Sequence, residues 1–147
     1  MRVLVDTSVW SLALRRNQPA ESPVVTELIE LIREVRCQMI GPVRQELISG
    51  IKSRVQFQKL RNHLRAFPDL EVTTRDYESA ADFFNICRGK GIQGSNTDFL
   101  ICAIAARHKL PIFTMDEDFT LFQSHLPITL HHPRTLYMWP PVAAKAP

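Results

Sequence analysis

The sequence predicts an α/β fold, a three-layer α/β/α sandwich around a mostly parallel sheet of four to five strands. Residues 3–5, Val-Leu-Val, are apolar without alternation, which is typical of a short strand buried on both faces. Segments with strand and helix patterns then alternate along the chain, the order expected of a parallel sheet covered by helices. A nearly all-apolar helical segment at 98–106 fits the centre of such a domain.

The first half of the chain contributes two strands and four helices. A helix is expected from residue 8 to residue 14, with Ser8 as its N-cap. Pro23 opens a second helix, because proline is tolerated at the first helical position, and apolar residues then recur at helical spacing to Val35. The remaining elements of this half are a strand at 37–40 and helices at 43–52 and 55–66.

The second half begins with a polar strand, 70–73, which is expected near an edge of the sheet. A helix at 77–87 follows, and its expected buried residues are Ala80, Ala81, Phe83 and Phe84. The last elements are the central helix ending near His108, a strand at 111–116, a short helix at 119–122 and a fifth strand at 128–130.

Length and composition indicate one ordinary globular domain. The chain has 147 residues, 45% hydrophobic and 22% charged. We expect a domain at 1–132 and a Pro-rich tail at 133–147, whose Tyr137 and Trp139 pack either on the domain or on a partner. No apolar run reaches the roughly 18 residues of a membrane span. The early first strand leaves no room for a signal peptide, so the expected location is the cytoplasm.

The three cysteines give no sign of a metal or disulfide site. Cys37, Cys87 and Cys102 are far apart in the sequence, odd in number and without metal-ligand spacing. Each lies in an apolar segment, so they are expected to be buried free thiols.

Positive charge is concentrated in one segment, although the net charge of the chain is only +3. Between Arg33 and Arg65 there are eight Lys or Arg residues against two acids, a net charge of +6. Such segregation suggests a polyanionic partner, and the alternative is the solvated face of two exposed helices.

Four acids fall at equivalent places in the predicted fold. Asp6 follows the first strand, and Asp116 follows the fourth. Glu46 lies on the helix after the second strand, and Asp98 opens the central helix. The carboxyl ends of parallel strands share one edge of a sheet, so these acids are expected to lie close together.

Each acid alone has a structural alternative. Ser95 and Asp98 match a capping box, while Asp6 and Asp116 could cap the helices that follow them. Glu46 could be a solvated helix residue. Together, however, two carboxylates about 4 Å apart repel by roughly 4 kcal/mol at an effective dielectric of 20. Four at one edge therefore point to a cation, and all-oxygen sites suit Mg²⁺ or Mn²⁺.

The same residues carry a resemblance to a known family. The ordered set is Asp6-Thr7-Ser8, Glu46, Asp98-x-x-Ile101-x-Ala103 and Thr114-x-Asp116-x-Asp118-Phe119. It resembles a PIN domain, and within that family the VapC-type ribonuclease toxins of toxin–antitoxin pairs, over residues 1–132. The resemblance implies a Mg²⁺- or Mn²⁺-dependent endoribonuclease, a homodimer, and inhibition by a small cognate antitoxin.

The resemblance also assigns roles by position. Asp6 and Asp98 correspond to the principal metal ligands. Glu46 and Asp116 correspond to the other two acids, one of which helps to orient the attacking water. The matching accessory positions are Ser8, Thr114 and Asp118, the last of which could instead cap the final helix.

With RNA as the implied substrate, part of the basic segment becomes a candidate RNA path. Its candidate residues are Arg44, Lys52, Arg54, Lys59 and Arg61. The antitoxin is the alternative occupant of this surface.

Three other functions remain to be separated from a nuclease. A PIN-like binding module would keep the fold without metal chemistry, and the presence of all four acids argues against it. An aspartyl phosphatase would need a second Asp where this chain has Ser8. A receiver domain would need an acidic pair where the chain has apolar residues 3–5.

Overall fold

The computed structural model describes residues 1–15 and 22–134 and contains four strands and seven helices in that part of the chain. All but the first two residues of the predicted tail at 133–147 lie outside the described residues. The strands are β1 (Val3–Val5), β2 (Cys37–Ile40), β3 (Asp69–Leu70) and β4 (Ile112–Phe113). The helices are α1 (Thr7–Leu14), α2 (Pro23–Arg33), α3 (Gly41–Ile48), α4 (Arg54–Leu64), α5 (Thr74–Gly89), α6 (Asn96–His108) and α7 (Asp118–Gln123).

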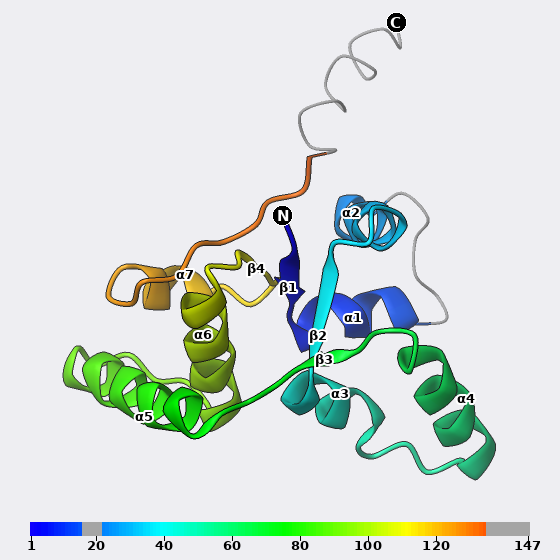
Figure 1. Cartoon of the computed structure of the whole chain (residues 1–147), viewed down its shortest axis with the longest axis horizontal. Coiled ribbons are helices and arrows are strands. Elements are labelled where there is room, and N and C mark those ends of the chain that lie inside the picture. The colour runs from blue at the N-terminus through cyan, green and yellow to red at the C-terminus, as the bar shows by residue number, and fades with distance from the viewer. Residues whose placement is uncertain (16–21, 135–147) are drawn as a thin grey trace, which may run out of the picture.

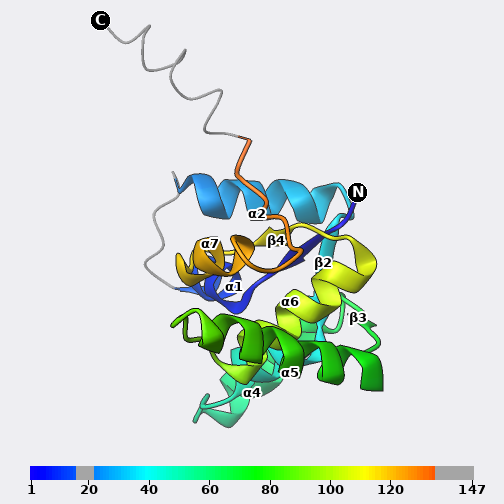
Figure 2. The ribbon, with the colours of Figure 1, turned by 90° about the vertical axis from the view of Figure 1, so that its left-hand side faces the viewer.

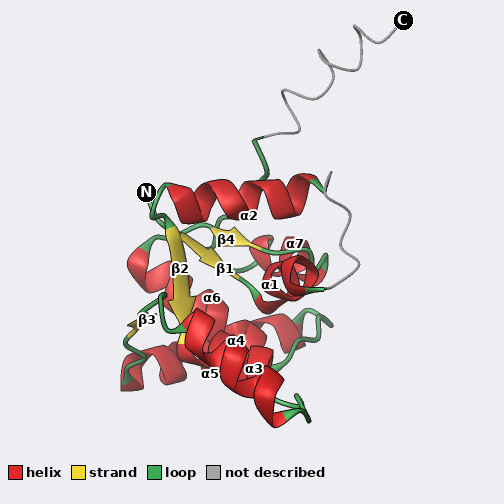
Figure 3. Ribbon diagram, turned by 90° about the vertical axis from the view of Figure 1, so that its right-hand side faces the viewer, coloured by secondary structure: helices red, strands yellow, loops and turns green. Residues whose placement is uncertain are grey.

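The sheet is entirely parallel, with strand order β3-β2-β1-β4, and the predicted α/β/α architecture is confirmed (Figure 1). Helices α5, α6 and α7 lie on one side of the strands and α1 and α2 on the other (Figure 1), and Figures 2 and 3 show these two sides in turn. As predicted, β3 is an edge strand. No helix among the described residues is long and apolar enough to cross a membrane.

The core is built on β1 and α6. The three residues of β1 are each 0% exposed, which explains their uninterrupted apolar character. In α6 every residue from 99 to 105 is buried, as expected for a central helix. Because β1, β2 and β4 run in parallel, the residues that follow them meet at one edge of the sheet. We call this the carboxyl edge.

Some predicted boundaries are wrong, for local reasons. The helix predicted at 43–52 ends at Ile48, because Ser49 is extended and Gly50 has a positive φ of 84°. The fifth strand, predicted at 128–130, is reduced to a single bridge between Leu130 and Ile112. On α5, Ala80 is buried, but Ala81 is exposed and both phenylalanines are only half-buried.

The helix α1 also begins differently from the prediction. Asp6, and not Ser8, occupies the N-cap position, and Ser8 lies inside the first turn. The Ser8 hydroxyl donates to the Asp6 carboxylate instead of accepting a helix N–H. The predicted N-cap role of Ser8 is therefore wrong, and its hydroxyl is available to the carboxyl edge.

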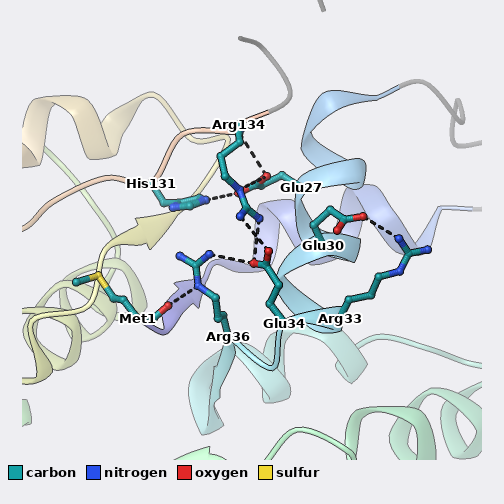
Figure 4. Close-up of polar contacts among 8 residues, drawn as sticks. All are labelled: Met1, Glu27, Glu30, Arg33, Glu34, Arg36, His131 and Arg134. Carbon is teal, nitrogen blue, oxygen red and sulfur yellow. Dashed lines mark hydrogen bonds and ion pairs between the residues drawn. The ribbon is translucent and has the colours of Figure 1, made fainter. Parts of the chain in front are cut away.

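A network of paired charges lies along α2 and is drawn in Figure 4. The Glu27 carboxylate of α2 is only 1% exposed and accepts from His131 Nε2 at 2.6 Å and from Arg134 Nε at 3.1 Å. Arg134 also pairs with Glu34, and its guanidinium holds the pKa of Glu34 below its usual value. Arg36, which precedes β2, donates to the carbonyl of Met1. These contacts fix the last described residues against α2 and give every carboxylate in the network a cationic or imidazole partner.

Candidate functional site

The carboxyl edge is organised around Asp6, the residue that follows β1. Asp6 is 6% exposed, and its backbone N–H donates to the carbonyl of Phe113 in β4 at 2.9 Å. Its Oδ2 accepts two hydroxyl hydrogen bonds of 2.8 Å, one from Ser8 and one from Thr114. The structure therefore brings both of these predicted accessory hydroxyls onto the first predicted acid.

A chain of hydrogen bonds continues from these hydroxyls to the acid after β4. The Met115 N–H donates to Ser8 Oγ, and the Asp116 N–H donates to Thr114 Oγ1, each at 3.0 Å. Asp116 Oδ1 in turn accepts from the backbone N–H of Asp118 at 2.9 Å. Asp118 thus contributes its N–H, while its exposed side chain makes no hydrogen bond among the described residues.

Asp98 reaches the same edge from the amino end of α6. It forms a capping box with Ser95, in which its Oδ2 accepts from the Ser95 N–H at 3.1 Å. Gly94 is needed just before it, because a Cβ there would lie 2.6 Å from the ring of Phe122. The capping alternative for Asp98 is therefore present in the structure.

Electrostatics links Asp98 to two of the other predicted acids. Burial raises the pKa of Asp98 above its usual value, and hydrogen bonds from Ser95 oppose that rise. The negative charges of Asp6 and Asp116 raise it further. Asp6 and Asp116 are thus close enough to Asp98 for their charges to disfavour its ionisation.

The fourth acid, Glu46, lies exposed on α3 and is linked to the edge by Thr7. The Thr7 hydroxyl donates to Glu46 Oε1 at 2.6 Å, across 39 residues of sequence. The sequence prediction did not assign Thr7 a role. Its position next to Asp6, on the first turn of α1, was the signal that could have suggested one.

The four acids share a feature that the paired acids of the fold lack. None of them forms an ion pair with a described Lys, Arg or His, whereas the acids that do are Glu27, Glu30, Glu34, Asp69 and Asp76. Each also commits one carboxylate oxygen to hydrogen bonds with the protein. The second oxygen of each has no hydrogen bond among the described residues and remains available to a ligand.

This donor set fits a hard divalent cation. It consists of carboxylate and hydroxyl oxygens, the ligands that Mg²⁺ and Mn²⁺ prefer. In the described part of the chain, no three His, Cys, Asp or Glu side chains are already close enough together to enclose a bare ion. Mg²⁺ usually keeps several waters and takes only one or two carboxylates from the protein. The residues present therefore fit a hydrated ion.

Cysteine chemistry is excluded from the edge. All three cysteines are free thiols, and Cys87 and Cys102 are buried. Burial raises the pKa of the half-buried Cys37 to about 12, so its thiol is neutral at physiological pH.

The predicted RNA-path residues divide into two groups. Arg44 is used inside the fold: its guanidinium pairs with Asp69 at 2.9 Å and donates to the carbonyls of Leu64 and Phe67. Lys52, Arg54 and Lys59 are exposed, Arg61 is half-buried, and none of these four forms an ion pair among the described residues.

Comparison with known proteins identifies the fold. A family model described as the PIN domain matches residues 3–123. The solved structure of FitAcB from Neisseria gonorrhoeae is similar, with 24% identity and a TM-score of 0.71 over 89% of this chain and 97% of that one. VapBC2 from Rickettsia felis, solved with a DNA fragment from its promoter, has 19% identity and a TM-score of 0.69 over 89% and 98% of the two chains.

A third structure is VapBC-5 from Mycobacterium tuberculosis, a member of the VapBC family of toxin-antitoxin systems. It has 18% identity and a TM-score of 0.63 over 88% of this chain and 96% of that one. No curated protein matches the sequence. Since the family model spans most of the sequence, including all four acids of the carboxyl edge, the chain belongs to the PIN domain family.

Proposed function

We propose that this chain is a Mg²⁺- or Mn²⁺-dependent endoribonuclease and the toxin of a toxin–antitoxin pair. The observation that carries the proposal is the set of four acids at the carboxyl edge, which have no cationic partner among the described residues and keep one carboxylate oxygen each uncommitted. The similar structures of VapBC and FitAcB proteins support a small antitoxin as its partner. We also propose a homodimer and a cytoplasmic location.

Each acid has a role that follows from its surroundings. Asp6 is buried and Asp98 is half-buried, and they would hold the cation with their free oxygens. The hydroxyls of Ser8 and Thr114 keep the Asp6 carboxylate in one orientation, as outer partners of metal ligands do. When bound, the ion lowers the pKa of water and stabilises charge on the scissile phosphodiester.

Glu46 and Asp116 would act on the water. Their free oxygens are acceptors that can orient the attacking water and take its proton as its oxygen bonds to phosphorus and the leaving oxygen departs. Glu46 is the more solvated of the two, so its proton can pass directly to bulk water.

Incubating the purified chain with single-stranded RNA tests the proposed activity. We expect internal cleavage with Mg²⁺ or Mn²⁺ and none with EDTA, and co-purified or added antitoxin should suppress cleavage. Binding of RNA without cleavage under every metal condition would support the alternative, a PIN-like binding module without activity.

The exposed part of the basic segment gives a second test. Replacing Lys52, Arg54 and Lys59 by alanine should weaken RNA binding and flatten its dependence on salt. Three lost phosphate contacts on a single strand should reduce the slope of log K against log salt by about 2. Binding measured by fluorescence anisotropy across a salt series gives this slope.

The control removes three cations from another helix, Arg75, Arg88 and Lys90 at α5 and its C-cap. If both triple variants lower affinity equally, the segment has no special role and is a solvated face. Arg44 is left intact, because it holds the end of α4 and β3 together.

A further inference from the structure

Thr7 links two of the candidate acids: it follows Asp6 in the sequence, and its hydroxyl is hydrogen-bonded to Glu46. It is the first residue of α1 and directly follows Asp6, and its hydroxyl donates to Glu46 Oε1 on α3 at 2.6 Å. Among the described residues this is the one hydrogen bond that the Glu46 side chain makes. The donor that fixes Glu46 is therefore separated from Asp6 by only one peptide unit.

This hydrogen bond is poorly placed to stabilise the fold. Glu46 is exposed and Thr7 is only half-buried, so both groups would be hydrated if the bond were absent. Exchanging water for protein at such a site contributes little to the stability of the folded state. A role for the bond must therefore be sought in what it does to Glu46.

What the bond does is restrict a side chain that is otherwise free. A glutamate on an exposed helix face samples many rotamers, and ordering it at the moment of ligand binding costs entropy. Threonine is a suitable anchor, because its branched Cβ restricts χ1. With Oε1 held by Thr7, the remaining oxygen of Glu46 is confined to a small region near the carboxyl edge.

We propose that Thr7 is a positioning residue, which sets the Glu46 carboxylate relative to Asp6 for the cation and its water. This inference rests on the proposed function and extends it to a residue outside the acid set. Thr7 acts only through Glu46 and does not touch the ion or the RNA.

The test compares Thr7→Val, which keeps the shape and removes the donor, with Thr7→Ser, which keeps the donor. Calorimetric titration of the full chain with Mn²⁺ should show affinity weakened about 10-fold in Thr7→Val and restored to near wild type in Thr7→Ser. Thermal melts in EDTA should place both variants within about 3 °C of wild type, since the bond contributes little to stability. RNA cleavage at saturating Mn²⁺ should remain low in Thr7→Val, because Glu46 is then mispositioned.

Thr74 supplies a matched control. It is likewise the first residue of a helix, α5, and it is exposed with no side-chain hydrogen bond among the described residues. Thr74→Val should change neither Mn²⁺ affinity nor cleavage. Equal losses in Thr7→Val and Thr74→Val would overturn the inference, because they would reflect the loss of any helix-start hydroxyl.

Glu46→Gln separates failure of this inference from failure of the proposed function. If Glu46→Gln weakens Mn²⁺ binding or cleavage and Thr7→Val does neither, Thr7 has no positioning role and the function stands. If Glu46→Gln changes neither Mn²⁺ binding nor cleavage, Glu46 is outside the site. The positioning role of Thr7 then fails, and the proposed function rests on the other three acids. A double variant no worse than Glu46→Gln alone supports action through Glu46, and additive losses contradict it.

Discussion

Asp98→Asn is expected to reduce metal-dependent RNA cleavage by at least about 100-fold, since the loss of even an outer partner of a metal ligand costs 10- to 100-fold. Asparagine keeps the shape of the side chain and an oxygen that can accept the Ser95 N–H, so α6 retains its cap. It removes the negative charge that the cation requires. The measurement is the single-turnover cleavage rate of an RNA oligonucleotide at a fixed Mg²⁺ concentration.

Asp82→Asn is the matched control for this prediction, because Asp82 is exposed on α5 and takes no part in the carboxyl edge. It should cleave at the wild-type rate. Asp6→Asn should lose cleavage to the same extent as Asp98→Asn, because Asp6 is the buried centre of the carboxyl edge. Wild-type cleavage by both site variants would remove the acids from the mechanism.

The second large effect concerns stability, at the ion pair between the buried Asp76 of α5 and the partly exposed Arg107 of α6. Arg107 donates to Asp76 at 2.6 and 2.8 Å, and the Asp76 side chain is only 1% exposed. Arg107→Met leaves this carboxylate buried without its cation. Breaking such a pair is expected to cost about 3 kcal/mol, which is roughly 6–12 °C in melting temperature for a chain of this size.

The pH dependence of that loss has a definite sign. The Arg107 guanidinium is the main cause of the lowered pKa of Asp76 and outweighs the opposing effect of burial. The pair therefore stabilises the fold above the ordinary pKa of an aspartate, and this contribution disappears as pH falls through the lowered value. Melting curves of wild type and Arg107→Met should differ most at neutral pH and converge in acid.

Arg75→Met, an exposed change on α5, is the control and should leave the melting temperature nearly unchanged. The Asp76 carboxylate also accepts hydrogen bonds from the N–H and the hydroxyl of Thr73. If Arg107→Met has the melting temperature of wild type at pH 7, Thr73 alone satisfies this buried carboxylate.

The sequence was most informative where a strand is largely buried. The predicted strands at 3–5 and 37–40 match β1 and β2 to the residue. The strand predicted at 111–116 stops at Phe113, because the N–H groups of Met115 and Asp116 donate to hydroxyls of the carboxyl edge and not to a neighbouring strand. The prediction missed the end of β4 because the site itself ends the strand.

The convergence of the acids was predictable from topology, since parallel strands bring their carboxyl ends together. The hydrogen-bond and ion-pair partners of individual side chains could not be predicted in this way. Arg44 was predicted to lie on an RNA path, but its guanidinium pairs with Asp69, which is 25 residues away in the sequence. Thr7 was overlooked because its acceptor, Glu46, lies 39 residues away on another helix. Contacts of this range depend on how α1, α3 and α4 pack, which local patterns do not encode.

Thermal melts of wild type and Asp98→Asn, in EDTA and in Mg²⁺, test most directly whether the acids converge to hold a cation. The raised pKa of Asp98 means that its charge opposes folding at neutral pH, so the amide variant should melt higher than wild type in EDTA. Mg²⁺ at one hundred times its Kd should stabilise wild type by about 2.7 kcal/mol, or roughly 5–10 °C, and the variant much less. A variant that melts lower in EDTA, with no effect of Mg²⁺ on either protein, would show that Asp98 is only a helix cap and would contradict the metal site.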